Sequence, residues 1–243
     1  MRFRVRGVVV VMAALVTVLG SAGPAFAGRP GSGGPTFLHF AGYDWQVKTS
    51  SRKIGPGPNL FSAANAWIGT DGLHLRIAKV GGKWNAAEVI NTTSLGRGSY
   101  SWTVAGDLAA LDPNAVLGLF TWNDDPAYNH REIDVEFSRF GNAADPTNGQ
   151  FVVQPYATTG NLVRITQPSA VTTSTHAFTW RTSSVDFATS AATPSSWTYA
   201  GPDVPQPGGE HARMNLWLFR GQPPSNGLPI EVVITSFTFT PLP

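Results

Sequence analysis

The chain has no cysteine and few charged residues. Of its 243 residues, 13% are charged, whereas 42% are hydrophobic and 11% aromatic. The lack of cysteine excludes disulfide-bonded scaffolds and thiolate metal sites. The low charge argues against disorder, because disordered chains are rich in charge and poor in aromatic residues. The 26 glycines and 19 prolines instead indicate a globular protein with many turns, long enough for one large all-β domain.

The first 27 residues have the pattern of a secretory signal peptide. Arg2, Arg4 and Arg6 precede an apolar run at residues 8–19, and Ala-Phe-Ala at residues 25–27 matches a cleavage site. The run is shorter than the roughly 20 apolar residues that cross a bilayer. We therefore predict a secreted protein that is cleaved after the last of these residues, with a retained N-terminal anchor as the alternative.

Cleavage would change the net charge of the chain. The segment holds three of the 17 basic residues and no acidic one, so the mature chain has 14 basic and 15 acidic residues and a formal charge of −1. Nucleic acids and anionic membranes both bind proteins with concentrated positive charge. We thus expect no nucleic-acid partner and no membrane association after cleavage, and we expect a monomer.

The rest of the sequence predicts an all-β domain behind a short linker. Residues 28–36 are rich in Gly, Pro and Ser, as in a flexible linker. Over residues 37–243, short runs of alternating apolar and polar residues are separated by turn residues, which is typical of an antiparallel sandwich or barrel. Only residues 107–111 are expected to form a helical turn. The clearest alternating runs lie at residues 73–77, 99–104, 151–153, 176–180 and 230–239.

Three acidic residues alternate along one predicted strand, residues 129–138. Glu132, Asp134 and Glu136 point to one face, because successive side chains of a strand point to opposite faces. Three negative charges this close repel one another unless one of the groups is protonated. A solvent-facing strand is one interpretation, since polar residues usually cover the outer face of an antiparallel sheet.

The second interpretation is the centre of a glycosidase. Glycosidic bonds are cleaved by one carboxylic acid that protonates the leaving oxygen and one carboxylate that attacks the anomeric carbon or activates water. Residues 132 and 136 are about 13 Å apart at Cα on a flat strand, but a bent, concave sheet lets two Glu side chains lean together. A separation of about 5 to 5.5 Å between the carboxyl groups would mean retention of configuration.

At these residues the sequence resembles a known family. Glu-Ile-Asp-Val-Glu-Phe at residues 132–137 is similar to the catalytic strand of family 16 glycoside hydrolases, in the form shared with bacterial lichenases. Further stretches resemble other motifs of the family in the same order, so the resemblance runs from about residue 59 to residue 239. They are Asn-Leu-Phe at 59–61, Trp-Asn-Ala-Ala-Glu at 84–88, Leu-Phe-Thr-Trp at 119–122, His-Ala-Phe-Thr-Trp at 176–180 and Met-Asn-Leu-Trp at 214–217.

The resemblance implies a fold, a reaction and a site. The fold is expected to be a β-jelly-roll sandwich of two antiparallel sheets with a concave substrate cleft. The reaction is expected to be endo-type hydrolysis of a β-linked glucan or galactan with net retention. Glu132 is implied as the nucleophile, Asp134 as the assisting carboxylate and Glu136 as the acid/base. The residues that fall where the family lines its cleft are Asn59, Glu88, Asn215 and Trp217.

The chain also departs from the family. In lichenases the residue that corresponds to Glu88 is followed by Tyr and Arg, which hold the sugar, whereas Val89 and Ile90 follow here. The Asp that helps to bind calcium in lichenases has no counterpart in residues 231–239. These differences leave the catalytic strand intact and the identity of the polysaccharide open.

Several other side chains are candidates for the cleft. Trp122 and Trp217 are expected there because aromatic faces stack on sugar rings, whereas Trp102 and Trp180 are expected in the core. For each of the remaining candidates a structural role is the alternative. These candidates are Tyr128 as a loop wall, His130 because it alternates with the acids, and Gln154 on the next strand.

We expect no metal site and no cofactor. The five histidines are scattered, and none of them has the i, i+2 or i, i+4 spacing of a metal site. The sequence has no phosphate-binding loop, dinucleotide fingerprint or serine-hydrolase motif. Two other functions remain as alternatives, a sugar-binding jelly roll without turnover and a transglycosylase that uses the same nucleophile.

Overall fold

The computed structural model describes residues 34–242. The predicted signal peptide and most of the predicted linker lie outside the described residues. Strand β1 (Thr36–Phe40) begins at the last residue assigned to the linker, one residue before the predicted start of the domain. In the described part of the chain no helix is long and apolar enough to cross a membrane.

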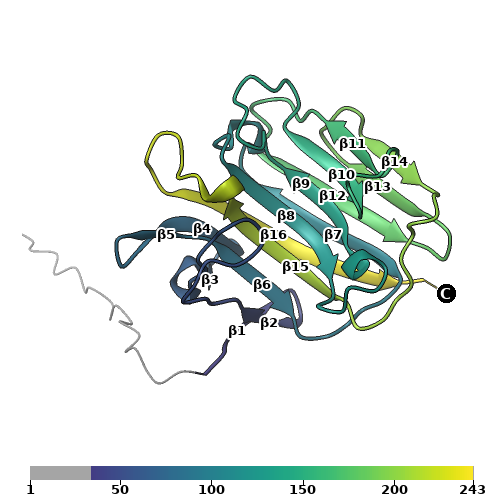
Figure 1. The fold of residues 1–243 in the computed structure, drawn as a ribbon, viewed down its shortest axis with the longest axis horizontal. Coiled ribbons are helices and arrows are strands. Elements are labelled where there is room, and N and C mark those ends of the chain that lie inside the picture. The colour runs from purple at the N-terminus through teal and green to yellow at the C-terminus, as the bar shows by residue number, and fades with distance from the viewer. Residues whose placement is uncertain (1–33, 243) are drawn as a thin grey trace, which may run out of the picture. The chain divides into compact units, whose positions relative to one another are not determined.

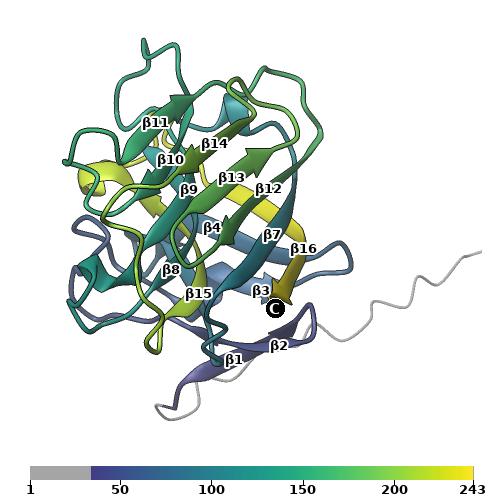
Figure 2. The same cartoon turned by 90° about the vertical axis from the view of Figure 1, so that its right-hand side faces the viewer.

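Two antiparallel sheets face each other in a jelly-roll sandwich, which confirms the predicted all-β fold (Figure 1, Figure 2). The first sheet has the order β1, β2 (Tyr43–Val47), β6 (Ala87–Asn91), β15 (His211–Leu218), β8 (Ala115–Trp122), β9 (Ile133–Phe137), β10 (Gly149–Val153) and β11 (Leu162–Ile165). The second sheet has the order β14 (Ser196–Tyr199), β13 (Val185–Thr189), β12 (Thr173–Trp180), β7 (Gly98–Ala105), β16 (Ile230–Pro241), β4 (Leu73–Val80) and β3 (Ala66–Ile68), and β5 (Lys83–Asn85) pairs with β4.

Short 3-10 helices join some of the strands. Within residues 34–242 there are four, each of three residues. One of them, η2 (Leu108–Ala110), confirms the helical turn predicted at residues 107–111. The side chain of its N-cap residue, Asp107, accepts a hydrogen bond from the Ala109 backbone N–H. The others are η1 (Ala63–Asn65), η3 (Asn129–Arg131) and η4 (Phe219–Gly221).

The core lies between the sheets and fixes which face of β9 is inside. Ile133, Val135 and Phe137 are fully buried there. Each such side chain contributes about 1.5–3 kcal/mol to folding when it leaves water. A shift of one residue would exchange these three side chains for the acids, so the register of the strand is strongly specified. Trp102 and Trp180 are fully buried as well, as predicted.

The pairing registers align side chains in rows across the outer face of the first sheet. Because each strand is paired with the next, partner residues on successive strands point to the same side. Two neighbouring rows contain acids of the trio and therefore define the floor of the candidate site. The first row is Glu88, Asn215, Gly118, Glu136, Gln150 and Arg164, and the second contains Ile90, Arg213, Phe120 and Asp134.

Candidate active site

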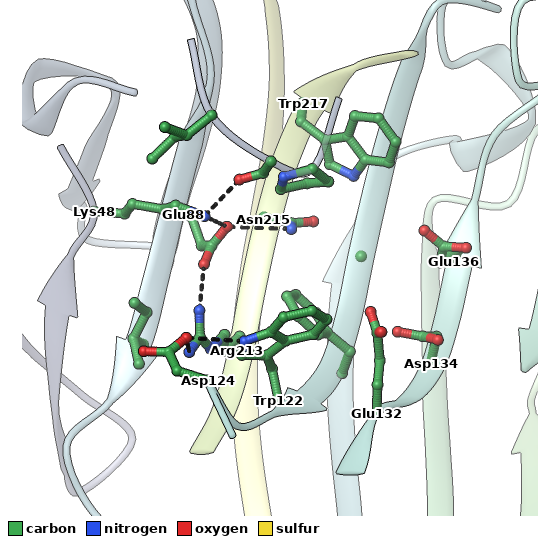
Figure 3. Close-up of a pocket in the computed structure, with 16 residues that line it drawn as sticks. Lys48, Glu88, Trp122, Asp124, Glu132, Asp134, Glu136, Arg213, Asn215 and Trp217 are labelled. Atoms are coloured by element: carbon green, nitrogen blue, oxygen red, sulfur yellow. Dashed lines mark hydrogen bonds and ion pairs between the residues drawn. The ribbon is translucent and has the colours of Figure 1, made fainter. Parts of the chain in front are cut away.

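A cavity of about 500 Å³ lies over these rows (Figure 3). The three acids form one side of it, and a group of charged and amide side chains forms the opposite side. Gly118 and Phe120 of β8 lie between the two sides. A cavity of this size, with both apolar and polar walls, suits a ligand of a few sugar rings.

The structure brings together the three acids that the sequence places on one face. Glu132 directly precedes β9, and Asp134 and Glu136 belong to it. All three line the cavity, and Asp134 lies deepest, with 3% of its surface exposed. The two glutamates keep part of their surface open toward the cavity. A substrate can therefore reach the outer two carboxyl groups, whereas the central one acts through its neighbours.

The pKa values of Glu132 and Asp134 are linked by a shared proton. Burial, followed by the charge of Glu136, raises the pKa of Glu132 to about 8. Burial, followed by the charges of Glu132 and Glu136, raises the pKa of Asp134 well above its ordinary value. A hydrogen bond between the side chains of Glu132 and Asp134 lowers the pKa of the first and raises that of the second. Since such a bond needs a proton on its donor, we assign that proton to Asp134, so Glu132 is the group of this pair that becomes a carboxylate first, as the pH rises through about 8.

Glu136 is held from the other side by a polar chain. Burial raises the pKa of Glu136, whereas a hydrogen bond from Gln150 and the charge of Arg164 lower it. Gln150 Nε2 donates to Glu136 Oε2 at 2.6 Å, and Arg164 Nη1 donates to Gln150 Oε1 at 3.1 Å. This chain fixes the orientation of the Glu136 carboxyl group. It also keeps the pKa of this group lower than burial alone would set it.

Gln154 contacts the central acid directly. It follows β10, and its Nε2 donates to Asp134 Oδ2 at 3.0 Å. This bond lowers the pKa of Asp134 against the stronger raising effect of burial. The Gln154 side chain thus orients Asp134, but it does not line the cavity as the sequence led us to expect.

The opposite wall is an ion cluster centred on Glu88. This residue is 1% exposed, and its carboxylate pairs with Lys48 Nζ at 2.8 Å and with Arg213 Nη1 at 3.1 Å. Asn215 Nδ2 lies 3.5 Å from the same carboxylate. Both oxygens of Glu88 are therefore engaged, as a buried carboxylate requires. The cluster presents cationic and amide groups to the cavity across from the acids (Figure 3).

Two tryptophans add flat apolar faces. Trp122 lies beside Glu132, and Trp217 lies on the side of Glu136, both lining the cavity (Figure 3). The Trp122 ring is stacked on His130, with centroids 4.1 Å apart and an interplanar angle of 8°. Its Nε1 donates to Asp124 Oδ1 at 3.0 Å. Aromatic faces that are fixed in this way can stack on the apolar faces of sugar rings.

Four residues expected in the cleft do not line the cavity: Gln154, described above, and Asn59, Tyr128 and His130. Asn59 is 4% exposed, and its amide donates to the Leu218 carbonyl and accepts from the Leu218 N–H, so it is used in joining loops. Tyr128 is 53% exposed on its loop, with the Arg131 guanidinium 5.3 Å from its ring centroid. His130 lies behind Trp122, and its Nδ1 is 2.9 Å from the Asn123 carbonyl oxygen.

The placement of His130 by alternation was wrong for a backbone reason. Residues 128–131 all have positive φ, between 52° and 62°. A left-handed turn does not alternate its side chains as a strand does, so the parity of the acids cannot be extended back to this segment. The turn is held by the Arg131 guanidinium, whose Nε donates to the Gln206 carbonyl at 3.0 Å.

Sequence reasoning missed Arg213, Lys48, Gln150 and Arg164. A signal existed for Arg213, because it alternates with Asn215 and Trp217 on one strand and must share their face. No comparable signal existed for Lys48, which reaches the site from beyond the end of β2. In the part of the chain that the structure describes, no group of three or more His, Asp or Glu side chains is arranged to hold a metal ion.

Comparisons with known proteins show a likeness of fold. No protein-family model matches the chain, and no curated protein matches it. A β-glucanase of Bacillus licheniformis has a similar structure, with a TM-score of 0.63 and 19% sequence identity over 86% of this chain and 99% of that one. A prokaryotic β-1,3-1,4-glucanase (lichenase) from a mouse hindgut metagenome is similar with a TM-score of 0.63 and 17% identity, over 86% and 99% of the two chains.

A third similar structure is the Crh5 transglycosylase in complex with NAG, with a TM-score of 0.55 and 14% identity over 86% of this chain and 88% of that one. Enzymes of glycoside hydrolase family 16 are among the other structures with this fold. The jelly-roll fold of this chain is therefore the fold of that family, which confirms the fold predicted from the resemblance of the sequence.

Proposed function

We propose that the chain is a secreted endo-acting glycoside hydrolase that cleaves internal β-glycosidic bonds of a glucan or galactan and retains configuration. The observation that carries the proposal is the buried trio of Glu132, Asp134 and Glu136, whose pKa values are all raised inside a cavity with tryptophan walls. The signal-peptide pattern of residues 1–27 supports secretion.

The first half of the proposed reaction forms a covalent intermediate. The Glu132 carboxylate attacks the anomeric carbon, and the bond from that carbon to the glycosidic oxygen breaks. Glu136 donates its proton to the departing oxygen, so the leaving sugar departs as a neutral alcohol. Glu132 then carries the glycosyl unit as an ester and is no longer charged.

The loss of this charge prepares the second half of the reaction. Because the charges of Glu132 and Glu136 raise the energy of the trio, neutralising Glu132 lowers the pKa values of the remaining two groups. Glu136, now a carboxylate, takes a proton from a water molecule. The water attacks the anomeric carbon, the ester bond breaks, and the Glu132 carboxylate is released. The shared proton on Asp134 stabilises Glu132 each time it becomes charged.

The layout of the cavity supports a polymeric substrate that crosses the strands. The rows of partner residues run from Glu88 on β6 to Glu136 on β9, perpendicular to the strand direction. Trp122 and Trp217 lie at different positions along the cavity and can each cover one sugar ring (Figure 3). The similarity of the fold to a β-glucanase and a lichenase supports a β-linked glucan first among the candidate substrates.

Transglycosylation is the second candidate, because the Crh5 transglycosylase shares this fold. It would use the same nucleophile, and a sugar hydroxyl would replace water in the second step. A sugar-binding protein without turnover is disfavoured by the trio. Burying three acids raises their pKa values and destabilises the folded state, and sugar binding without catalysis does not require three buried acids.

The test is to incubate the mature chain with β-1,3-, β-1,3-1,4- and β-1,4-glucans, agarose, carrageenan and xyloglucan, and to size the products by chromatography. Shorter products indicate hydrolysis, and products longer than the supplied oligosaccharides indicate transglycosylation. Glu132→Gln should lose nearly all activity, whereas Asp44→Asn, which changes an exposed acid outside the cavity lining, should keep most of it. Release of reducing sugar by Glu132→Gln at the rate of the unmodified chain would contradict the proposal.

A further inference from the structure

We propose that Arg213 is a sugar-binding residue of the cleft and that its guanidinium binds hydroxyl groups of an uncharged sugar. The inference rests on the proposed function and adds to it the residue and the substrate class on the wall opposite the acids. The sugar unit concerned lies between Arg213 and Glu132. Both residues line the cavity, and the charge of Arg213 lowers the pKa of Glu132.

The first observation is that the guanidinium of Arg213 is buried but only partly bonded. Arg213 is 8% exposed, and a guanidinium has five N–H donors. Nη1 donates to Glu88 at 3.1 Å, whereas Nη2 lies 3.6 Å from Asp124 Oδ1, beyond hydrogen-bond distance. Nε has no hydrogen-bond partner. Buried donors without partners are costly, so a ligand that supplies acceptors at this wall gains binding energy.

The second observation is an unpaired acceptor on the same strand. Asn215 is 2% exposed, and its Oδ1 has no hydrogen-bond partner. It lies beside Gly118, where a Cβ would come within 2.5 Å of this oxygen. The absence of a side chain at Gly118 therefore lets the Asn215 carboxamide lie directly against the backbone of β8. Donors from Arg213 and an acceptor from Asn215, two residues apart, match a sugar ring, whose hydroxyl groups both accept and donate.

The third observation explains how this wall is built. Ile90 and Arg213 are direct partners in the pairing of β6 with β15. Both residues line the cavity, so an arginine at either partner position faces the same wall. Partner side chains on a sheet lie about 4.5–5.5 Å apart at Cβ. The guanidinium therefore reaches the same part of the cleft from the neighbouring strand.

The charges of the wall indicate which sugars it binds. Lys48 and Arg213 are offset by Glu88 and Asp124. The wall thus has no net formal charge, and the acids across the cavity repel anions. Sulfated or uronic-acid sugars gain nothing from such a site, whereas hydroxyl groups can use its unpaired donors. This favours a neutral hexose polymer over a sulfated galactan.

Binding can be measured without turnover in the Glu132→Gln background. The probe is a β-1,3-1,4-linked gluco-tetrasaccharide, and its dissociation constant is obtained by calorimetry. Arg213→Met keeps the apolar part of the side chain. Arg213→Lys keeps the positive charge beside Glu88 but removes the planar guanidinium with its several N–H donors. We expect both to weaken binding about tenfold or more, which is the effect of losing a hydrogen bond from a charged group. Arg181→Met, an exposed arginine of another hairpin, is the matched control and should not change the dissociation constant.

Moving the arginine from position 213 to its partner position 90 distinguishes an effect on sugar binding from an effect on folding. Adding Ile90→Arg to Arg213→Met returns a guanidinium to the wall, and the dissociation constant should move back toward that of the parent. In the chain with Glu132 intact, Arg213→Lys should raise KM more than it lowers kcat. A dissociation constant within twofold of the parent for both Arg213 variants would overturn the inference, as would a loss of binding that follows a loss of Tm and is not recovered by Ile90→Arg.

Failure of the inference is distinguishable from failure of the proposed function. If the unmodified chain cleaves a glucan while the Arg213 variants bind the probe as the parent does, only the inference falls. If the chain cleaves no polymer and binds no oligosaccharide, both fall. Tighter binding of κ-carrageenan oligosaccharides than of the neutral probe at low salt would also overturn the assignment of an uncharged sugar.

Discussion

Replacing Glu132 by Gln should make the protein more stable at neutral pH while it abolishes turnover. The folded state raises the pKa of Glu132 from 4.5 to about 8, so it holds this proton more tightly than the unfolded state does. The free energy of unfolding therefore falls as the pH rises from about 4.5 to about 8. Each pH unit in this range lowers the free energy of unfolding by about 1.4 kcal/mol, so the loss at pH 7 amounts to about 3 kcal/mol. Gln does not titrate and still offers Asp134 an oxygen as hydrogen-bond acceptor.

Urea unfolding at pH 5, 7 and 8.5 measures this effect directly. Between pH 5 and pH 7 the unmodified chain should lose about 3 kcal/mol more of its unfolding free energy than Glu132→Gln does. Tyr156→Phe serves as the control, because Tyr156 is 67% exposed and does not line the cavity, and the pH dependence of this variant should match that of the unmodified chain. Identical slopes for the unmodified chain and Glu132→Gln would refute the assignment of a raised pKa to this acid.

Three further results are expected. Gln150→Leu removes a hydrogen bond that lowers the pKa of Glu136, so the alkaline limb of kcat/KM against pH should move upward; an unchanged profile would show that the contact has no effect on the acid. Gly118→Val would place its Cβ 2.5 Å from Asn215 Oδ1, so it should displace the Asn215 carboxamide in the floor of the cavity and lower kcat/KM about 100-fold or more, and near-normal activity would place the substrate elsewhere. Burial lowers the pKa of His74, but the hydrogen bonds that its ring donates to the carboxylates of Glu231 and Asp71 raise this pKa above 6.5 overall. The stabilisation by this cluster is therefore complete below pH 6.5 and is lost as the pH rises through the raised value. Glu231→Gln should therefore destabilise the protein more at pH 5.5 than at pH 9 in thermal unfolding, and an equal effect at both values would argue against a charged His74.

The sequence predicted the face on which the acids lie because their strand has a strict period of two and a fully apolar inner face. Ile133 and Val135 leave only one register that buries them, so Glu132 and Asp134 had to lie outside. The fold class followed from the same alternation in many short strands. Such periodic features depend only on near neighbours in the chain, and for that reason one sequence is enough to find them.

The ion cluster could not be predicted in the same way. Arg213 and Glu88 are 125 residues apart, and they meet only because β15 pairs with β6 in one register. Strand order and pairing depend on the whole fold, and alternation within one strand does not reveal them. The prediction for His130 was wrong for a local reason, because the left-handed turn at residues 128–131 interrupts the alternation of side chains just before the acids begin.

The position of β9 inside the sheet has a consequence for the order in which the molecule opens. The backbone of β9 is hydrogen-bonded to β8 along one edge and to β10 along the other, so all of its amides reach solvent only when both pairings break. We expect these amides to be among the slowest to undergo hydrogen exchange. Lys48 and Trp122, at strand ends, should become unprotected at much lower cost. Warming or mild denaturant should thus open this wall of the cavity while the three carboxyl groups are still in register.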